Sequence, residues 1–256
     1  MTKMVRLGVI IAVLGLLVTA VSAGHERATA ADTTVVTMLD GTARVYAKAS
    51  PAGTPLKKND HVHKGQEVRV GERSRLELRF SDGTVMRFSE GTTVKMDDLA
   101  YDSKTQNKKV RVDMERGKLW ASVRKLVTSD SKVEVKTVNA VAGVRGTVYR
   151  VNVEDDNSAL VKVYDGSVYV DGVQKGEPKE APAGGFTAPV PVPGPSQVPA
   201  PYHEVSMEEW HVIVKSFQQI TISPTGAASK PQDFNPQQDL DDWVKWNQER
   251  DNQLQH

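Results

Sequence analysis

Residues 74–84 read SRLELRFSDGT, and this stretch decides the fold class. Apolar side chains occupy every second position from Leu76 to Phe80, with charged side chains between them. A period of two is typical of a β-strand that has one buried face and one face in water. Asp82-Gly83 follows and supplies the positive φ that a tight turn requires, so the stretch predicts a strand and the turn of a hairpin. The residues expected to point into water are Arg75, Glu77 and Arg79.

The same alternation recurs between Thr33 and Val173, in short runs separated by turn residues. Period-two runs cover residues 110–115, 133–137 and 147–153. Further Asp-Gly pairs stand at residues 40–41, 165–166 and 171–172. No stretch of this region has the spacing of a long amphipathic helix. We therefore predict an all-β domain over residues 31–175, built as a multi-stranded β-sandwich or roll.

The composition excludes several functional classes. The chain has 256 residues and no cysteine, which rules out disulfides, thiolate metal sites and a cysteine nucleophile. Lys and Arg number 33 against 32 Asp and Glu, and the net charge of +1 gives no argument for a nucleic-acid partner. A hydrophobic content of 39% supplies a core for part of the chain rather than for all of it.

Residues 1–30 have the pattern of a bacterial signal peptide. Two basic residues precede an uncharged apolar run over residues 7–23, and small residues allow cleavage after Ala23 or after Ala30. We therefore expect a periplasmic or secreted protein. The alternative is an uncleaved inner-membrane anchor, because seventeen apolar residues reach the lower end of the length that spans a bilayer, about 17–25 residues. Only in that case do we expect a contact with the membrane.

The chain after the predicted β-domain divides into a linker and a tail. Eight of the 13 prolines lie between Glu177 and Pro201, which predicts an extended, semi-rigid linker over residues 176–203. Residues 204–256 are expected to form a short helical tail. The sequence therefore predicts a signal peptide, one β-domain, a proline-rich linker and this tail.

Two helices are expected in the tail. The first begins at the capping box Ser206–Glu209 and carries apolar residues three or four apart as far as Ile220, and we expect it to pack on the β-domain. The second covers Asp239–Asn252 and begins with acidic residues, which favour the positive end of a helix dipole. Its apolar stripe is narrow, so docking within the chain and binding to a partner both stay open.

The sequence lacks the motifs of the common enzyme classes. It has no phosphate-binding glycine loop, no G-x-S-x-G, no H-E-x-x-H and no calcium loop of the D-x-D-x-D-G type. His61 and His63 could reach one metal ion from a strand, but no third ligand is identifiable, so an exposed pair is the preferred interpretation. We therefore predict a non-enzymatic protein without a catalytic, cofactor or metal site.

One segment, residues 137–150, combines strand-like residues with glycines. It reads TVNAVAGVRGTVYR and places Gly143 and Gly146 on either side of Arg145. Glycine within a strand pattern marks a bulge, a corner or a close approach of two backbones. We predict a corner at which Arg145 bonds turn carbonyls or a carboxylate; exposure to an anionic partner is the alternative. The predicted structural positions are Asp82, Gly83, Gly143, Arg145, Gly146, Thr147, Asp165 and Gly166.

Four segments, in this order, resemble the FecR domain, which is named after a bacterial regulator of iron-citrate transport. They are HKGQEVRVGERSRLELRFSDGT (63–84), VDMERGKLWASV (112–123), VAGVRGTVYRV (141–151) and VKVYDGSVYV (161–170). The resemblance covers roughly residues 60–170 and implies an extracytoplasmic β-rich module. In founding members this module receives a signal from an outer-membrane transporter, and a cytoplasmic N-terminal segment controls a sigma factor. Only six residues precede the apolar run here, which we expect to be too few for such a segment.

These observations lead to one preferred function and two alternatives. We expect an exported, non-enzymatic binding or sensing module of the cell envelope with a protein partner, no cofactor and no nucleic acid. The first alternative is a membrane-anchored component that relays an extracytoplasmic signal. The second is a glycan-binding protein in which aromatic side chains stack on sugar rings, although aromatics at alternate strand positions more often belong to a core. The candidates for stacking are Trp120, Tyr149, Tyr164 and Tyr169.

Overall fold

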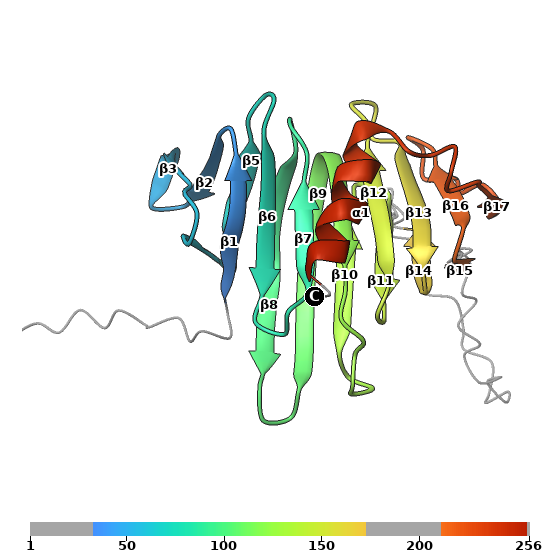
Figure 1. The fold of residues 1–256 in the computed structure, drawn as a ribbon, viewed down its shortest axis with the longest axis horizontal. Helices are drawn as coiled ribbons and strands as arrows, with labels where there is room; N and C mark the ends of the chain where they lie inside the picture. Colours follow the sequence, from blue (N-terminus) through green and yellow to red (C-terminus); the bar gives the residue numbers. More distant parts are fainter. Residues whose placement is uncertain (1–32, 173–210, 255–256) are drawn as a thin grey trace, which may run out of the picture.

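The computed structural model describes residues 33–172 and 211–254, which form seventeen strands and one helix. The predictions of a signal peptide over residues 1–30 and of a proline-rich linker over 176–203 lie outside the described residues. Within them, no helix is long and apolar enough to cross a bilayer. The prediction of an all-β domain is confirmed, because the strands build two large sheets that face each other (Figure 1).

Within the described residues, sheet A contains nine strands, and each pair of neighbouring strands is antiparallel. In spatial order they are β4 (His61–His63), β1 (Thr33–Asp40), β6 (Arg75–Phe80), β7 (Val85–Phe88), β9 (Asn107–Ser122), β12 (Val148–Val153), β13 (Ala159–Asp165), β16 (Gln218–Ile222) and β17 (Gln232–Asp233). The predicted hairpin is confirmed: β6 and β7 pair with Leu78 opposite Met86, and Gly83 between them has a φ of +85°.

Sheet B also has nine strands in the part of the chain that the structure describes, and it shares β9 with sheet A. In spatial order they are β3 (Ser50–Pro55), β2 (Ala43–Ala47), β5 (Glu67–Val70), β8 (Thr93–Asp102), β9, β10 (Lys132–Lys136), β11 (Ala140–Val144), β14 (Ser167–Gly172) and β15 (His211–Lys215). The β9–β10 pair is parallel. Residues 107–116 of β9 pair with β8, whereas residues 117–122 pair with β7 and β12, so this strand passes from one sheet to the other at Gly117.

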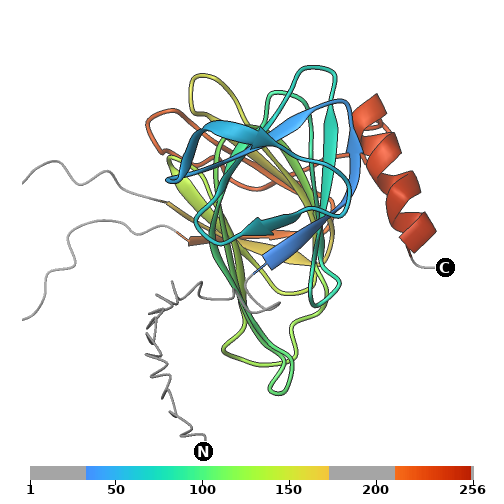
Figure 2. The same ribbon diagram turned by 90° about the vertical axis from the view of Figure 1, so that its left-hand side faces the viewer.

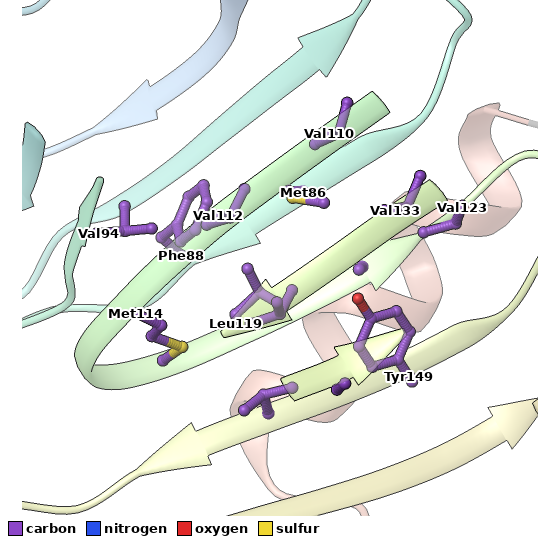
Figure 3. Close-up of a cluster of buried hydrophobic side chains, with 14 of the residues drawn as sticks. Met86, Phe88, Val94, Val110, Val112, Met114, Leu119, Val123, Val133 and Tyr149 are labelled. Carbon is purple, nitrogen blue, oxygen red and sulfur yellow. The ribbon is translucent and has the colours of Figure 1, made fainter. Parts of the chain in front are cut away.

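The main core fills the space between the two sheets. It takes the apolar side chains that alternate along each strand, such as Leu76 and Leu78 on β6 and Val110 and Val112 on β9, all of them buried. Figure 3 shows core side chains from several strands, among them Val110 and Val112, inside the sandwich. The period-two pattern therefore identifies the inner faces because each strand contributes every second residue to the core.

Tyr149 places a hydroxyl group in this apolar core (Figure 3). The side chain is 0% exposed, burial raises its pKa, and its hydroxyl has no hydrogen-bond partner among the described residues. An unsatisfied buried polar group costs about 1–3 kcal/mol. We therefore expect Tyr149→Phe to raise the free energy of unfolding by about 1 kcal/mol in urea titrations. Tyr164→Phe is the matched control and should lower it, because the Tyr164 hydroxyl donates to Asp239 Oδ2 at 2.6 Å.

The prediction of a helix from Ser206 to Ile220 is wrong. Residues 211–215 and 218–222 form the strands β15 and β16, joined by a tight turn in which Phe217 has a φ of +63°. β15 adds to the edge of β14 and β16 adds to the edge of β13. The β-branched residues of this segment suit strands, and two open sheet edges override the helical spacing of its apolar residues. The β-domain therefore extends beyond the predicted boundary at residue 175.

Two other local predictions have opposite outcomes. Asp171-Gly172 is not a turn, because Gly172 ends β14 in register with Ala140 of β11. The second tail helix is confirmed as α1 (Asp242–Leu254). Asp241 caps it by accepting a hydrogen bond of 2.7 Å from the backbone N–H of Val244.

Candidate functional site: the outer face of sheet A beneath the C-terminal helix

A row of polar and aromatic side chains crosses the outer face of sheet A. Directly paired residues of neighbouring strands share one face of a sheet, about 4.8 Å apart. The register pairs Glu77 with Arg87, Arg87 with Trp120, Trp120 with Arg150, and Arg150 with Lys162. We call these five residues the charged row; they come from β6, β7, β9, β12 and β13.

α1 and the residues just before it cover the charged row. The helix runs diagonally over β12, β9 and β7 in Figure 1, and Figure 2 shows it on the outside of the sandwich. Glu77, which the alternation predicts to point into water, is 1% exposed, and Arg87 is 0% exposed. The prediction for Glu77 is wrong because the alternation identifies the face that points away from the core but not what packs on that face.

Arg87 is the centre of the contacts at the C-terminal end of α1. Its Nε donates to Glu77 Oε2 at 2.8 Å, and its Nη1 donates to Asp251 Oδ1 at 2.7 Å and to the Asn247 carbonyl at 3.2 Å. Asp251 uses its second oxygen to accept a 2.9 Å bond from Trp120 Nε1. One carboxylate of the helix thus joins two members of the charged row.

Glu77 is the buried acid of this end. It accepts hydrogen bonds from Arg87, from Thr37 Oγ1 at 2.6 Å, and from Arg250 Nη2 at 3.1 Å to each oxygen. Burial alone would raise its pKa, but the hydrogen bonds from Arg87 and Thr37 and the charges of Arg87 and Arg250 outweigh that effect. The pKa of Glu77 is therefore lowered, and the group is a carboxylate at neutral pH.

Asp239 holds the other end of the tail, just before α1 begins. Its Oδ1 accepts bonds from Arg150 Nη2 at 2.8 Å and from Lys162 Nζ at 2.6 Å, and its Oδ2 accepts from the Tyr164 hydroxyl. Arg150 also lies 3.6 Å from Asp241. Burial, with the hydrogen bond to Asp239, raises the pKa of Tyr164, so its hydroxyl stays a donor at neutral pH.

Aromatic packing between these two ends forms a small cluster of its own. Trp120 and Tyr164 of the sheet lie with ring centroids 4.6 Å apart and pack with Trp243 and Val244 of α1. Trp246 stacks on Trp243 at 5.4 Å. This cluster is separate from the main core, to which no described residue of α1 contributes. The helix therefore adds a second, thinner layer rather than completing the sandwich.

Four of the predicted structural positions meet at one corner, where the chain passes between the sheets. Gly146 has a φ of +77°, and a Cβ there would lie 2.8 Å from Lys125 Cα; Gly166 has a φ of +87° and lies against Gly146. Thr147 Oγ1 donates to the Ser167 carbonyl at 2.9 Å, and Asp165 is the last residue of β13.

The other predicted positions lie close to this corner. Arg145 is exposed and donates to the Thr128 carbonyl at 3.2 Å, and Gly143 lies inside β11 opposite Tyr169. The Asp82-Gly83 turn is near, because the backbone N–H of Arg124 donates to Thr84 and that of Val123 donates to the Thr147 carbonyl.

Asp82 has a second role at that turn. It accepts a 2.6 Å bond from Lys108 Nζ, which is buried in the sandwich, and it bonds both the amide and the hydroxyl of Thr84. Burial lowers the pKa of Lys108, and the charge of Asp82 opposes this shift. The ion pair thus holds the β6–β7 turn against the side of the molecule where β9 begins.

The proposed sugar-stacking aromatics do not form one platform. Trp120, Tyr149 and Tyr164 are at most 9% exposed, whereas Tyr169 is 47% exposed on β14. His61 and His63 lie on β4 with ring centroids 6.5 Å apart. Residues 33–172 and 211–254 contain no group of three His, Asp or Glu side chains that could hold a metal ion.

The comparisons with known proteins define the class of the chain. Its described residues form an all-β sandwich with an outer face that α1 covers. Residues 66–169 match the family model described as FecR protein. The chain therefore contains a FecR domain at residues 66–169.

Structural relatives are more distant. Two crystal structures of a "putative anti-sigma factor" from Parabacteroides distasonis ATCC 8503, at 1.65 and 2.50 Å resolution, superpose with TM-scores of 0.44 and 0.43 at 20% identity. The matched region covers 67% of this chain and 61% of each of those chains. No curated protein matches the sequence.

Acid is expected to weaken the attachment of α1. The pKa of Glu77 is lowered in the folded chain, so its contribution to stability is complete above its ordinary pKa of 4.5 and is lost as the pH falls through the lower folded value. We expect the free energy of unfolding to fall steeply below about pH 4.5, with a change in tryptophan fluorescence. Glu77→Gln should be less stable at pH 7 and show a shallower acid dependence. If the free energy of unfolding of Glu77→Gln falls with pH as steeply as that of the wild type, Glu77 is not the cause of the acid dependence.

Proposed function

We propose that this protein is a non-enzymatic, exported module that binds a protein partner in a signalling system of the bacterial envelope. The observation that carries the proposal is the FecR domain at residues 66–169. The covered face of sheet A supports it, because Arg, Trp and Tyr side chains gathered on one surface are typical of the residues that dominate protein interfaces.

Export and the absence of catalysis belong to this proposal. The apolar run at residues 7–23 supports export, and the absence of common enzyme motifs from the sequence supports a binding role. A membrane-anchored component remains the alternative form of the same signalling function. Mass spectrometry of the protein from envelope fractions separates the two: a first residue at 24 or 31 indicates cleavage, and a retained residue 1 indicates the anchor.

The test of the proposal is capture of a partner by the full-length protein. An affinity-tagged chain is expressed in its own bacterium, crosslinked in living cells and purified from envelope extracts. We expect one protein to be enriched over a tagged, unrelated exported β-sandwich. Recovery of the same proteins by both baits would contradict the proposal, and so would hydrolysis of an envelope substrate by the purified chain.

A further inference from the structure

We propose that the outer face of sheet A is a docking site for an acidic, tryptophan-containing helix. In the structure α1 occupies this site, and we infer that a helix of a partner protein with the same chemistry replaces it. The inference deepens the proposed function and rests on it, because it names the surface and the class of partner.

Charge complementarity is the first argument. The segment 239–254 carries five carboxylates and two cations. The sheet meets it with four basic side chains and one acid, Glu77. The four basic side chains are Arg75, Arg87, Arg150 and Lys162. A neutral or basic helix would leave Arg150 and Lys162 covered without a carboxylate and Arg87 with Glu77 alone, which costs several kcal/mol.

The separation of α1 from the main core is the second argument. Three residues of the helix are buried, namely Trp243, Val244 and Asn247, and its last described residue, Leu254, is 39% exposed. The main core is complete without any of them. Elements that bury few apolar side chains open locally at a lower free energy than the core strands. α1 can therefore leave the sheet while the sandwich stays folded.

The geometry of the contacts specifies what the replacing helix and the residues just before it must present. One carboxylate has to reach Arg87 and Trp120 as Asp251 does, and a second has to reach Arg150, Lys162 and Tyr164 as Asp239 does. Between them, indole rings have to pack on Trp120 and Tyr164. Each carboxylate bonds a cation together with an aromatic donor, so position as well as charge selects the partner.

The test uses the full chain and a labelled peptide with the sequence of residues 236–254. In the variant Asp239→Asn/Asp251→Asn the tail loses its two anchoring carboxylates, while the sheet face is unchanged. The matched control is Asp242→Asn/Glu249→Gln, which removes the same charge from two exposed helix residues. Circular dichroism and thermal unfolding check that each chain is folded.

The expected result in fluorescence anisotropy is at least tenfold tighter peptide binding by the first variant than by the wild type or the control, because its site is more often open. A peptide with lysine in place of its aspartates should not bind. If the variant does not fold, saturable binding of the acidic peptide alone to the wild type supports the inference.

Failure of the inference and failure of the proposed function give different results. No saturable binding by the folded variant, or equal binding of the acidic and lysine peptides, would overturn the docking site. Peptide binding without any envelope partner would retain the site and contradict the signalling role. An envelope partner captured equally by the wild type and by Asp239→Asn/Asp251→Asn would retain the signalling role and overturn the docking site.

Discussion

Replacing Arg87 with methionine is expected to lower the free energy of unfolding by about 3–5 kcal/mol, because breaking a buried ion pair by removing one partner is strongly destabilising. Arg87 is fully buried, and its guanidinium joins Glu77 of the sheet to Asp251 of α1. The substitution leaves Glu77 with only Arg250 and Thr37, and Asp251 with only Trp120, and it removes the cation that the two carboxylates share. Equilibrium unfolding in urea, followed by far-UV circular dichroism, measures the loss.

The control for this prediction is an exposed ion pair with similar geometry. Arg111 Nη2 lies 2.8 Å from Glu134 on the outer face of sheet B, where the arginine side chain is 49% exposed. Arg111→Met should cost less than about 1 kcal/mol, since exposed pairs contribute little. Glu77→Gln/Arg87→Met should recover part of the loss, because it removes both buried charges. If Arg87→Met and Arg111→Met lower the free energy of unfolding equally, the Arg87 ion pair is not buried as the structure shows.

Gly117→Ala is expected to destabilise the protein by about 3–5 kcal/mol, which combines a backbone strain of about 1–3 kcal/mol with the cost of a steric clash. β9 passes between the sheets at this glycine, which has a φ of +100°. A Cβ there would lie 2.6 Å from Thr92 Cα, so the backbone of the neighbouring segment has to move. Urea unfolding compared with the wild type gives the effect.

Gly65→Ala is the control that measures backbone strain without a steric clash. Gly65 has a φ of +81°, but a Cβ at this position has nothing within 4 Å. Its substitution should cost only the strain of a left-handed backbone, about 1–2 kcal/mol. If Gly117→Ala lowers the free energy of unfolding no more than Gly65→Ala does, the point where β9 passes between the sheets tolerates a side chain.

The inner faces of the strands were predictable from the sequence, and the outer face of sheet A was not. Alternation places Leu76 and Leu78 in the core without knowledge of their partners. The functional surface depends instead on contacts such as Arg87 with Asp251, whose residues are 164 positions apart. Local periodicity contains no information about such pairs, and register between distant strands does not follow from it.

The tail also shows that local sequence signals alone do not decide which element a segment forms. α1 was predictable because the acidic residues at its start are a local signal. The segment at residues 211–222 has helical spacing as well, yet it forms strands because β13 and β14 offer edges for it to pair with. Of the predicted structural positions, Gly146 and Gly166 were recognisable from their neighbours, whereas Arg87, Asp239 and Asp251 of the candidate site were missed.

Native-state hydrogen exchange of the wild-type chain tests most directly whether the outer face of sheet A is a site that α1 can vacate. The measurement follows amides of α1 and of β9 at increasing, sub-denaturing concentrations of urea. We expect α1 amides to exchange at least about tenfold faster than those of β9, through an opening with little urea dependence. If the amides of α1 and β9 exchange with the same free energy of opening and the same urea dependence, α1 leaves the sheet only when the sandwich unfolds. That result would contradict the docking site.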